Sequence, residues 1–436
     1  MLAAVGFLMI GVFTTLIMTR RVTAIVALIL VPMVFALTLG AGPRVGDMML
    51  GGVRETAPTA VLLLFAILYF GLMIDVGLFE PLVRRIVRWA GDDPVRVTVG
   101  HAALASAVAL DGDGTTTFLV TVSALLPVYR RLGLNPLVFA VIGGGCITIM
   151  NMSPWGGPAA RAATALKIEP AELFMPLLPT MLIGLGFTFA LAWWLGRRER
   201  SRLRSAAPAA STVVERDLGR SAFDSDPAAR RPRLTLFNLL LTVVLMTAVV
   251  LHLAPLPALF MTGCAVALLV NYPSLADQRA RMLAHAPSVL SVAILVLAAG
   301  SFTGVLSATG MVQAMSASVV AVTPPALGPA FAPVTALLSA PLTFFLSNDA
   351  FYFGVLPVLA DAARSYGVSP AEMGRAALLG QPVHGLSPLV AAVYLQCALL
   401  NVELSEVQKF SLKYAAATCG VLIAAALITG AIPLMN

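Results

Sequence analysis

Long apolar runs, separated by short loops that carry arginines, constrain the fold of this chain more than any other feature. Only 11% of its 436 residues are charged, against about 25% in soluble domains. So little polar surface cannot cover a globule in water, and lipid must therefore be the solvent for much of the chain. The runs long enough to be spanning helices are residues 2–18, 22–42, 58–79, 176–196, 235–251, 256–272, 286–309 and 414–434.

Charge and cysteine usage exclude nucleic acid binding and a cysteine metal site. The net charge is +7, but the arginines lie mostly in short loops between apolar runs, a pattern that reports membrane topology. The N-terminus lacks a basic region and a small-residue cleavage site, so residues 2–18 are predicted to be a span and not a signal peptide. The cysteines have no CxxC spacing and are predicted to be core residues: Cys146, Cys264, Cys397 and Cys419.

Two further segments of spanning length, residues 137–166 and 374–400, are interrupted near their middle. The interruptions read NMSPWGGP (Asn151–Pro158) and QPVHGLSP (Gln381–Pro388). Proline and glycine break the hydrogen-bond ladder of a helix. Backbone left unpaired at membrane depth is tolerated only where protein or a cavity covers it. Both segments are therefore predicted to be discontinuous helices in the interior of the protein.

Two other apolar segments fold back without crossing. Residues 97–129 reach the tip DGDGTTT and return, and each arm, at about 14 or 15 residues, is shorter than the roughly 20 that a span needs. Arg96 precedes the first arm and Arg130 follows the second, which places both ends on one side of the membrane. Residues 331–361 repeat this arrangement around the turn LSNDAF (Leu346–Phe351). Both segments are predicted to be re-entrant hairpins.

The positive-inside rule gives an orientation. Arg20 and Arg21 are placed in the cytoplasm, so the N-terminus lies outside. Counting crossings from there, the hairpin at 97–129 enters from the cytoplasm and the hairpin at 331–361 enters from outside. The segment 197–234, rich in Ala, Ser, Pro and Arg, is predicted to be a flexible basic cytoplasmic linker. Both termini are expected on the periplasmic side of a bacterial inner membrane.

The two halves of the chain match each other. Residues 1–196 and 235–436 each contain five predicted crossings and one hairpin, and an odd number inverts the second half relative to the first. Inverted repeats with discontinuous helices are typical of secondary transporters, which bind substrate where the repeats meet. The matched landmarks are Gly71–Gly77 with Gly304–Gly310, Pro127 with Pro357, and Pro158 with Pro388.

The predicted fold is an all-α polytopic membrane protein, built from an inverted-topology repeat with two re-entrant hairpins and two discontinuous helices. The hairpin tips and helix breaks are expected to converge near the bilayer centre, where helix termini offer N–H groups to anions and carbonyls to cations. Placing an ionisable group at that depth costs free energy, so its presence there indicates a function. The candidate substrate-binding residues are Asp111, Asp113, Thr115, Thr116, Thr117, Asn151, Ser153, Gly156, Gly157, Arg161, Ser347, Asn348, Asp349, Gln381, His384 and Ser387.

Structural roles compete with binding at several of these positions. Asp111 and Asp113 are also suited to cap the hairpin turn, and the threonines after them to bond helix carbonyls. Arg161 is suited to an anion, to an ion pair with Asp113, or to the membrane surface. His384 is either a ligand or a satisfied core histidine. A calcium loop is excluded because the pattern requires an acidic or amide ligand at Thr115 and a glutamate later.

Several stretches of the chain, including LDGDGTTTFLVTVSALLPVYRRLGLNPLV, NMSPWGGPAARAATAL and SNDAFYFGVLPVL, resemble the CitMHS citrate transporters of the ion transporter superfamily. The resemblance covers nearly the whole chain except the linker. It implies uptake of citrate complexed with a divalent metal ion, of the magnesium or calcium type, together with protons. It also implies a homodimer in which a transport domain moves against a fixed scaffold, an elevator-type mechanism.

Electrostatics favour a metal–citrate ligand over free citrate. Citrate carries three negative charges near pH 7 and would meet the carboxylates of Asp111, Asp113 and Asp349, a repulsion of several kcal/mol in a low-dielectric cavity. A divalent cation reduces the ligand to a charge of −1. Asp113 and Asp349 are expected to face the metal of the bound citrate. Protons are expected to be coupled through four groups: Asp111, Asp113, Asp349 and His384.

Other functions remain open at this point. A carrier of the same superfamily for another di- or tricarboxylate, or an ion antiporter, has the same fold. The DGDGTTT tip departs from the serine-asparagine-threonine clamps of sodium-coupled relatives and argues against sodium coupling. The chain has no HExxH or GxSxG motif, and it is expected not to be an enzyme and to hold no permanent cofactor.

Overall fold

A computed structural model describes residues 1–205, 229–324 and 327–435, and every regular element in these ranges is helical. The first half contains α1 (Leu2–Met18), α2 (Ala24–Thr38), η1 (Gly42–Arg44), α3 (Val45–Asp75), α4 (Glu80–Ala90), α5 (Pro94–Val108), η2 (Ala109–Asp111), α6 (Gly114–Leu132), α7 (Pro136–Met150), α8 (Gly157–Leu166) and α9 (Pro170–Ser205).

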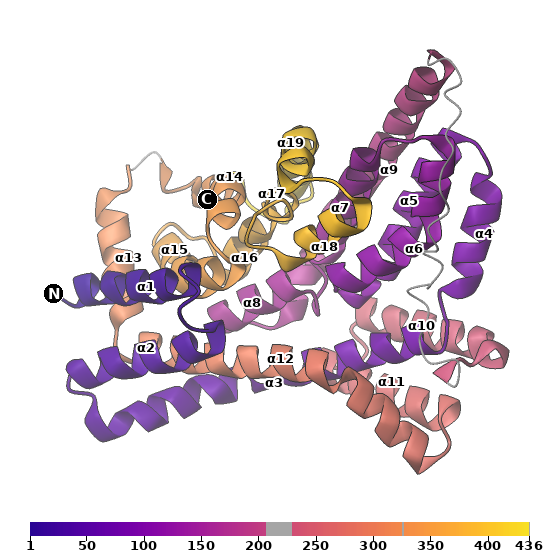
Figure 1. Cartoon of the computed structure of the whole chain (residues 1–436). Helices are drawn as coiled ribbons and strands as arrows, with labels where there is room; N and C mark the ends of the chain where they lie inside the picture. Colours follow the sequence, from indigo (N-terminus) through magenta and orange to yellow (C-terminus); the bar gives the residue numbers. More distant parts are fainter. Residues whose placement is uncertain (206–228, 325–326, 436) are drawn as a thin grey trace.

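The second half is helical in the same way (Figure 1). It contains η4 (Pro232–Leu234), α10 (Thr235–Val250), α11 (Leu256–Asn271), α12 (Leu275–Ala308), α13 (Met311–Val322), α14 (Phe331–Phe345), the π-helical η6 (Ala350–Val355), α15 (Leu356–Arg364), α16 (Pro370–Leu378), α17 (Gln381–His384), α18 (Ala391–Leu400) and α19 (Leu404–Ile428).

The helices have the lengths and composition of a multi-pass membrane protein. Shorter apolar helices, α1, α2 and α7 among them, accompany a set that is long and apolar enough to cross a bilayer alone. This confirms the predicted all-α fold class. The long apolar helices within the described residues are Gly42–Asp75, Pro170–Ser205, Pro232–Val250, Leu275–Ala308 and Leu404–Ile428.

The longest packed pair of helices is α3 with α12, one from each half of the chain (Figure 1). Gly52 of α3 faces Gly300 and Gly304 of α12, and small residues spaced four apart let two backbones approach closely. A Cβ added at Gly300 would lie 2.2 Å from the Thr56 Oγ1 atom. Near the other end of the pair, Asp75 Oδ2 lies 2.8 Å from His285 Nε2. Close backbone packing and this polar contact together join the two halves.

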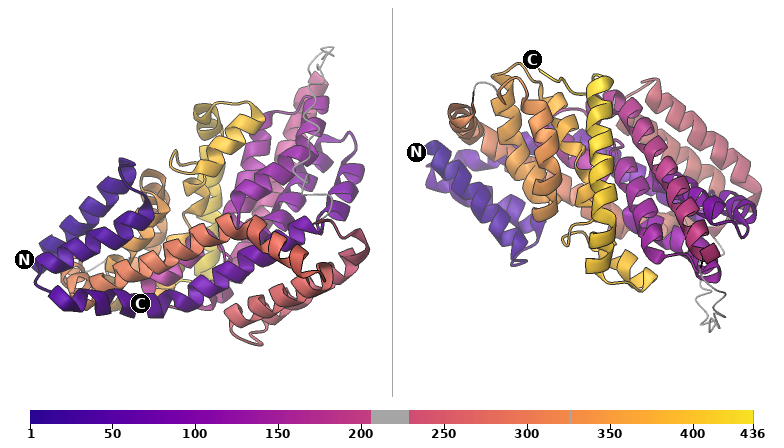
Figure 2. Two further views of the ribbon diagram at one scale, coloured as in Figure 1. Left: turned by 60° about the horizontal axis from the view of Figure 1, so that its bottom comes forward. Right: turned by 90° about the horizontal axis from the view of Figure 1, so that it is seen from above.

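The helices α5, α6, α7, α9 and α19 form a bundle beside the α3–α12 pair, with α9 and α19 side by side (Figure 2, right). Within the bundle, α5, η2 and α6 make the predicted first hairpin, which turns at Gly112 with φ of +77°. This left-handed conformation favours glycine. The second hairpin consists of α14, a turn, η6 and α15. The arms α5 and α14, at 15 residues each, are shorter than a bilayer span, whereas α6 has 19 residues and is longer than the predicted second arm.

Both predicted helix breaks are present. Helix α7 ends at Met150 and α8 begins at Gly157, so the first break matches NMSPWGGP. Helix α16 ends at Leu378 and α18 begins at Ala391, and between them only Gln381–His384 form a helical turn, α17. The broken segments therefore expose helix ends inside the protein, where the sequence predicted them.

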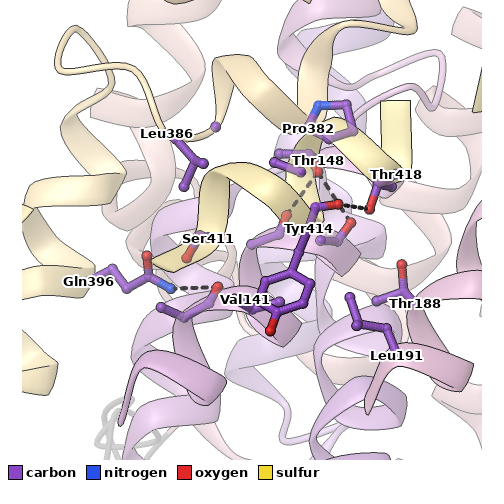
Figure 3. A pocket seen from close by; sticks show the side chains of 15 residues that line it. Val141, Thr148, Thr188, Leu191, Pro382, Leu386, Gln396, Ser411, Tyr414 and Thr418 are labelled. Carbon is purple, nitrogen blue, oxygen red and sulfur yellow. Dashed lines mark hydrogen bonds between the residues drawn. The ribbon is translucent and has the colours of Figure 1, made fainter. Parts of the chain in front are cut away.

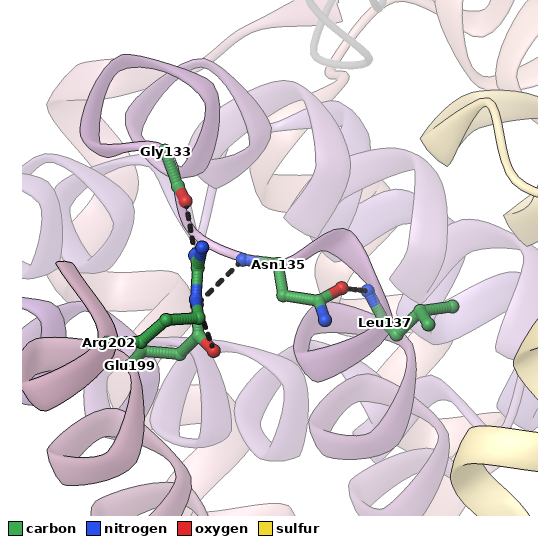
Figure 4. Close-up of polar contacts among 5 residues, drawn as sticks. All are labelled: Gly133, Asn135, Leu137, Glu199 and Arg202. Carbon is green, nitrogen blue, oxygen red and sulfur yellow. Dashed lines mark hydrogen bonds and ion pairs between the residues drawn. The ribbon is translucent and has the colours of Figure 1, made fainter. Parts of the chain in front are cut away.

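One predicted boundary is wrong: residues 197–205 are not part of the 197–234 linker but the last turns of α9. Glu199 is 5% exposed and accepts hydrogen bonds from Arg202 and from the Asn135 N–H at 2.9 Å. Arg202 also donates to the Gly133 carbonyl at 2.6 Å (Figure 4). These bonds tie the end of α9 to the α6–α7 loop and extend the helix. Residues 206–228 of the linker lie outside the described residues, and the division into two repeats stays a prediction.

Candidate functional site

The two aspartates of the first tip organise the turn itself. Asp111 is buried, and its Oδ1 accepts the Asp113 N–H at 2.8 Å. Asp113 is the N-cap of α6 and accepts the N–H groups of Thr115 and Thr116 at 3.0 and 3.1 Å. The capping role is therefore real. Among the described residues, no hydrogen bond or ion pair joins either carboxylate to the other three segments.

The three threonines of this tip differ in whether their side-chain hydroxyl is already hydrogen-bonded within the protein. Thr117 is buried, and its hydroxyl donates to the Asp113 carbonyl at 3.0 Å, the back-bonding alternative. The Thr116 hydroxyl donates to Asp113 Oδ2 at 2.7 Å. Thr115 is exposed and uses only its backbone N–H in the cap. Of the three, Thr115 is the one whose side chain is available to a ligand.

The first break contains buried polar atoms without partners. Asn151 Oδ1 and Ser153 Oγ are both buried and have no hydrogen-bond partner among the described residues. An unpaired buried polar atom costs about 1–3 kcal/mol, which indicates that something else binds it. Trp155 is 4% exposed and donates from Nε1 to the Leu110 carbonyl at 2.7 Å, which fixes the break against the first hairpin.

Arg161 and Asp349 join the two halves of the chain at the site. Arg161, on α8 after the first break, donates from Nε to Asp349 Oδ1 at 2.7 Å. Its NH1 donates to the Gly157 carbonyl at 3.1 Å, and the remaining nitrogen takes part in neither bond. The two side chains are 22% and 17% exposed, so the pair is partly open. Arg161 forms no ion pair with Asp113, the partner that the sequence offered as an alternative.

The second tip is bonded to the second break. Gln381 is 2% exposed, and its Nε2 donates to the Tyr352 hydroxyl at 2.8 Å and, weakly, to Asn348 Oδ1 at 3.4 Å. Ser347 Oγ accepts the Ala350 N–H at 3.2 Å and so caps the start of η6. The amide of Gln381 therefore positions the tip, and Tyr352 is a residue of this site that the sequence did not indicate.

The second break is also held by the first arm of the second hairpin. His384 Nδ1 lies 2.6 Å from the Thr343 carbonyl, and Ser387 Oγ donates to the Phe344 carbonyl at 2.7 Å. Both side chains are buried. Carbonyls Thr343 and Phe344 come from the end of α14, so these bonds satisfy part of a helix C-terminus that the re-entrant turn would leave unpaired.

Contacts between neighbouring segments link the tips and breaks in series. A Cβ at Gly112 of the first tip would lie 3.3 Å from the Gly156 Cα atom of the first break. The first break meets the second tip through Arg161, and the second tip meets the second break through Gln381. A Cβ at Gly385 of the second break would lie 2.6 Å from a side-chain atom of Thr148 on α7. The convergence of all four segments on one substrate site stays a prediction.

A cavity beside the second break, with polar side chains in a mainly apolar wall, was not predicted from the sequence. Its wall includes Gln396 of α18 and Ser411, Tyr414 and Thr418 of α19 (Figure 3). The signal was the spacing of the α19 residues, which places them on one face of a helix. Within a long apolar run these hydroxyl residues resembled ordinary core positions.

Comparison with known families decides the kind of protein. Residues 4–380 match the CitMHS family, described as citrate transporter. The chain belongs to the CitMHS family. This membership makes it a transporter of citrate-transporter type and not an enzyme, and it makes the apolar helices those of a multi-pass membrane protein.

Two relatives from Bacillus subtilis (strain 168) match this CitMHS chain from end to end. One, named citrate transporter, is 51% identical over 438 residues, which cover 99% of this chain and all of the relative. The other, named Mg(2+)/citrate complex secondary transporter, is 46% identical over 439 residues and 99% of both chains.

A solved structure resembles this CitMHS chain in fold. The YdaH transporter of Alcanivorax borkumensis superposes with a TM-score of 0.61, at 14% sequence identity, over 89% of each chain. At this identity the likeness supports the fold alone. It agrees with an all-α membrane transporter.

Proposed function

We propose that this CitMHS member takes up citrate as a complex with a divalent metal ion, coupled to proton symport, by an elevator-type movement. The observation that carries the proposal is the Arg161–Asp349 pair at 2.7 Å, which sets one cation and one anion side by side where the two halves meet. A bare tricarboxylate meets attraction at one and repulsion at the other. A metal–citrate complex presents both signs of charge and suits both groups.

Several groups are suited to bind the citrate part. The Arg161 nitrogen outside the ion pair is a donor for a carboxylate, since arginine forms forked bonds to such groups. The first break offers Asn151 Oδ1 and Ser153 Oγ, which lack protein partners in the described chain. Thr115 adds a free hydroxyl from the first tip. These groups all come from the first half of the chain, and Asp349, which pairs with Arg161, adds a group from the second half.

The metal of the complex is substrate, of the magnesium or calcium type. Carboxylate oxygens are the ligands that such hard cations prefer. Asp349 Oδ1 is bonded to Arg161, which leaves Oδ2 to face the metal. Asp113 presents an exposed side chain at the first tip, although its oxygens also cap α6. The name of the B. subtilis relative that carries an Mg(2+)/citrate complex supports this choice of substrate.

Protons are proposed to bind at the carboxylates and the histidine of the site. Neutralising Asp111, Asp113 or Asp349 reduces repulsion against an anionic ligand, so proton binding and ligand binding favour each other. His384 lies beside the second break, and Arg161 and Asp349 are the charged groups whose fields reach it. The proposal places proton uptake and substrate uptake on the same moving unit.

The packing of the first break against α3 and α11 supports the elevator-type movement. Trp155 of the first break packs on Phe260 of α11 and Phe70 of α3, with ring centroids 4.9 and 5.5 Å apart. This contact is aromatic and apolar, while Lys167 at the end of α8 pairs with Glu55 of α3 at 2.7 Å, an ion pair that the movement must break. The hairpins and breaks are bonded to one another and move as one unit past α3 and α11. A homodimer in a bacterial inner membrane, with periplasmic termini, completes the proposal.

The test is uptake of labelled citrate by purified protein in liposomes. We expect uptake only when a divalent ion is present, tested across magnesium, calcium, manganese and zinc, and stimulation by an inward proton gradient. Arg161→Ala is expected to abolish it, with Gly186→Ala as a control far from any side chain. Uptake of free citrate at full rate without any divalent ion would overturn the metal–citrate proposal. Uptake that ignores the gradient would overturn proton coupling.

A further inference from the structure

A cavity with a mainly apolar wall and several hydroxyl groups lies against the second break. It is a cavity between α7, α9, α17 and α19, with about 30 Å³ open to the centres of water molecules. One water needs about 10–15 Å³ by this measure, so the cavity has room for about two. Among the residues that line it none is charged. Its size and lining suit water.

Two hydroxyl groups in its wall lack partners. Ser411 and Tyr414 are 3% and 9% exposed, and neither Ser411 Oγ nor Tyr414 Oη has a hydrogen-bond partner among the described residues. Figure 3 shows both side chains on α19, directed toward α7. By contrast, the hydroxyls of Thr188 and Thr418, also in the wall, bond carbonyls of their own helices at 3.0 and 2.8 Å. Buried hydroxyls are nearly always bonded, and water is the partner that fits here.

Polar residues extend along α19 from the cavity toward the start of the helix. Residues Gln408, Ser411 and Tyr414 follow one face of α19 at helical spacing. Gln408 Nε2 donates to the Leu386 carbonyl of the second break at 2.9 Å. Toward the start of α19, a surface depression is lined by Glu403 and Glu406.

The two spaces share helix α18, where Gln396 lines the cavity and the next residue, Cys397, lines the depression. Pro382 and Gly385 of the second break also line the cavity and flank His384 in sequence. The cavity therefore lies against the second break.

We propose that this cavity holds water molecules that bond Ser411 and Tyr414 and carry protons between the surface depression and His384. The inference rests on the proton coupling proposed above and names its route. Each transfer is balanced: an oxygen accepts one proton, releases another to the next oxygen, and no electrons are exchanged. The imidazole of His384 accepts the last proton at its free nitrogen, while Nδ1 stays bonded to Thr343. Arg161 and Asp349 are the charged groups around this end of the route.

The test separates proton movement from substrate movement. The double variant Ser411→Ala/Tyr414→Phe removes both hydroxyls and keeps the Tyr414 ring, which packs on Trp194. Gly144→Ala adds a methyl group to the cavity wall, where a new Cβ meets no heavy atom within 4 Å. Thr188→Val is the matched control, because its hydroxyl is already bonded to Gly184.

Each variant is reconstituted in liposomes that contain a pH-sensitive dye. One assay measures magnesium–citrate uptake and proton entry under a pH gradient. The other measures exchange of labelled for unlabelled magnesium–citrate at equal pH, which needs no net proton movement. For the double variant and for Gly144→Ala we expect gradient-driven uptake to fall at least tenfold and exchange to stay within twofold of wild type. Thr188→Val is expected to match wild type in both assays.

Three outcomes decide between the explanations. Gradient-driven uptake at the wild-type rate in the double variant would overturn the route while leaving the proposed function intact. An equal loss in both assays would show that the hydroxyls support the fold and not proton movement, and would also overturn it. Wild-type protein that exchanges magnesium–citrate without moving protons would instead overturn the coupling on which the route depends.

Discussion

Arg161 of the first half donates to Asp349 of the second half at 2.7 Å, and both side chains are partly exposed. The pair serves either to hold the halves together or to bind ligand. Exchanging the charges, with Arg161→Asp and Asp349→Arg together, keeps an ion pair but moves the guanidinium from α8 to the tip of the second hairpin. We expect each single change and the exchange to reduce citrate uptake at least tenfold, about 1.4 kcal/mol of binding. The exchange alone is expected to restore the thermal stability that either single change lowers.

Uptake and the unfolding midpoint in detergent are the two measurements. Recovery of full uptake in the exchanged protein would show that the pair is only a structural tie.

The unpaired hydroxyl of Ser153 in the first break predicts that its removal weakens ligand binding without lowering the stability of the fold. Ser153→Ala removes a buried atom that bonds nothing in the described chain, so the midpoint of thermal unfolding should not fall. Metal–citrate affinity, measured by calorimetry, should weaken about tenfold, which is about 1.4 kcal/mol. Ser387→Ala is the contrast, because its hydroxyl bonds Phe344 and should cost about 1 kcal/mol of stability. A large loss of stability in Ser153→Ala with unchanged affinity would contradict the binding role.

Two variants of Asp113 distinguish its role as a helix cap from the role of its negative charge. Asparagine caps helices about as well as aspartate, whereas alanine loses the cap at a cost of about 1 kcal/mol. Asp113→Asn keeps one of the two acceptor oxygens that cap α6, so it is expected to lower the stability of the first tip less than alanine does and to reduce uptake at least tenfold. Asp113→Ala is expected to reduce both. Normal uptake by the asparagine variant would leave Asp113 a cap alone, and the measurement is initial uptake rate at matched protein density.

The close approach of α3 and α12 predicts where the fold tolerates no side chain. A Cβ at Gly300 meets Thr56 Oγ1 at 2.2 Å and the Gly52 carbonyl at 2.8 Å, so Gly300→Ala must push the helices apart. We expect little folded protein by size-exclusion chromatography. Gly186→Ala, whose Cβ meets no heavy atom within 4 Å, should fold and gain slightly in helix propensity. Equal yields of the two variants would argue against the tight packing.

Asp93, in the loop before α5, predicts a pH dependence. Partial burial raises its pKa, but hydrogen bonds from Arg200 and the Val95 N–H outweigh this and hold the pKa below its usual value. An aspartate with a lowered pKa in the fold stabilises it at neutral pH, and this stabilisation is lost as the pH falls below about 4. The difference in unfolding midpoint between wild type and Asp93→Asn should therefore shrink from pH 7 to pH 3.

Asp92→Asn is the control, because Asp92 pairs with Arg131 at the exposed surface and surface pairs contribute little. A difference that stays constant over this pH range would contradict the assignment.

The sequence predicted the hairpins and breaks because proline and glycine act locally on the backbone. NMSPWGGP ends α7 and precedes α8 within a residue or two of the expected positions. Partners of side chains were harder to predict, because they depend on how helices rotate against each other. Arg161 bonds Asp349 and not Asp113, and Trp155 faces α3 and α11, two facts that no spacing along the chain contains.

A second difficulty in prediction is that the same residue type has different roles in different places. A threonine or serine in an apolar run bonds its own helix in most cases, so Ser411 and Thr418 looked alike in sequence. The structure separates them, because Thr418 bonds Tyr414 and Ser411 bonds nothing described. The end of α9 was placed too early for a similar reason: the arginine-rich composition of 197–205 suggested a linker, while Glu199 and Arg202 stabilise a helix there.

Because Arg161 and Asp349 are 188 positions apart in the chain, the ion pair that joins the two halves forms only after Asp349 has been synthesised. A nascent chain that ends before Asp349 carries the groups of the first half without this pair. The complete charge arrangement of the site is therefore a late product of synthesis.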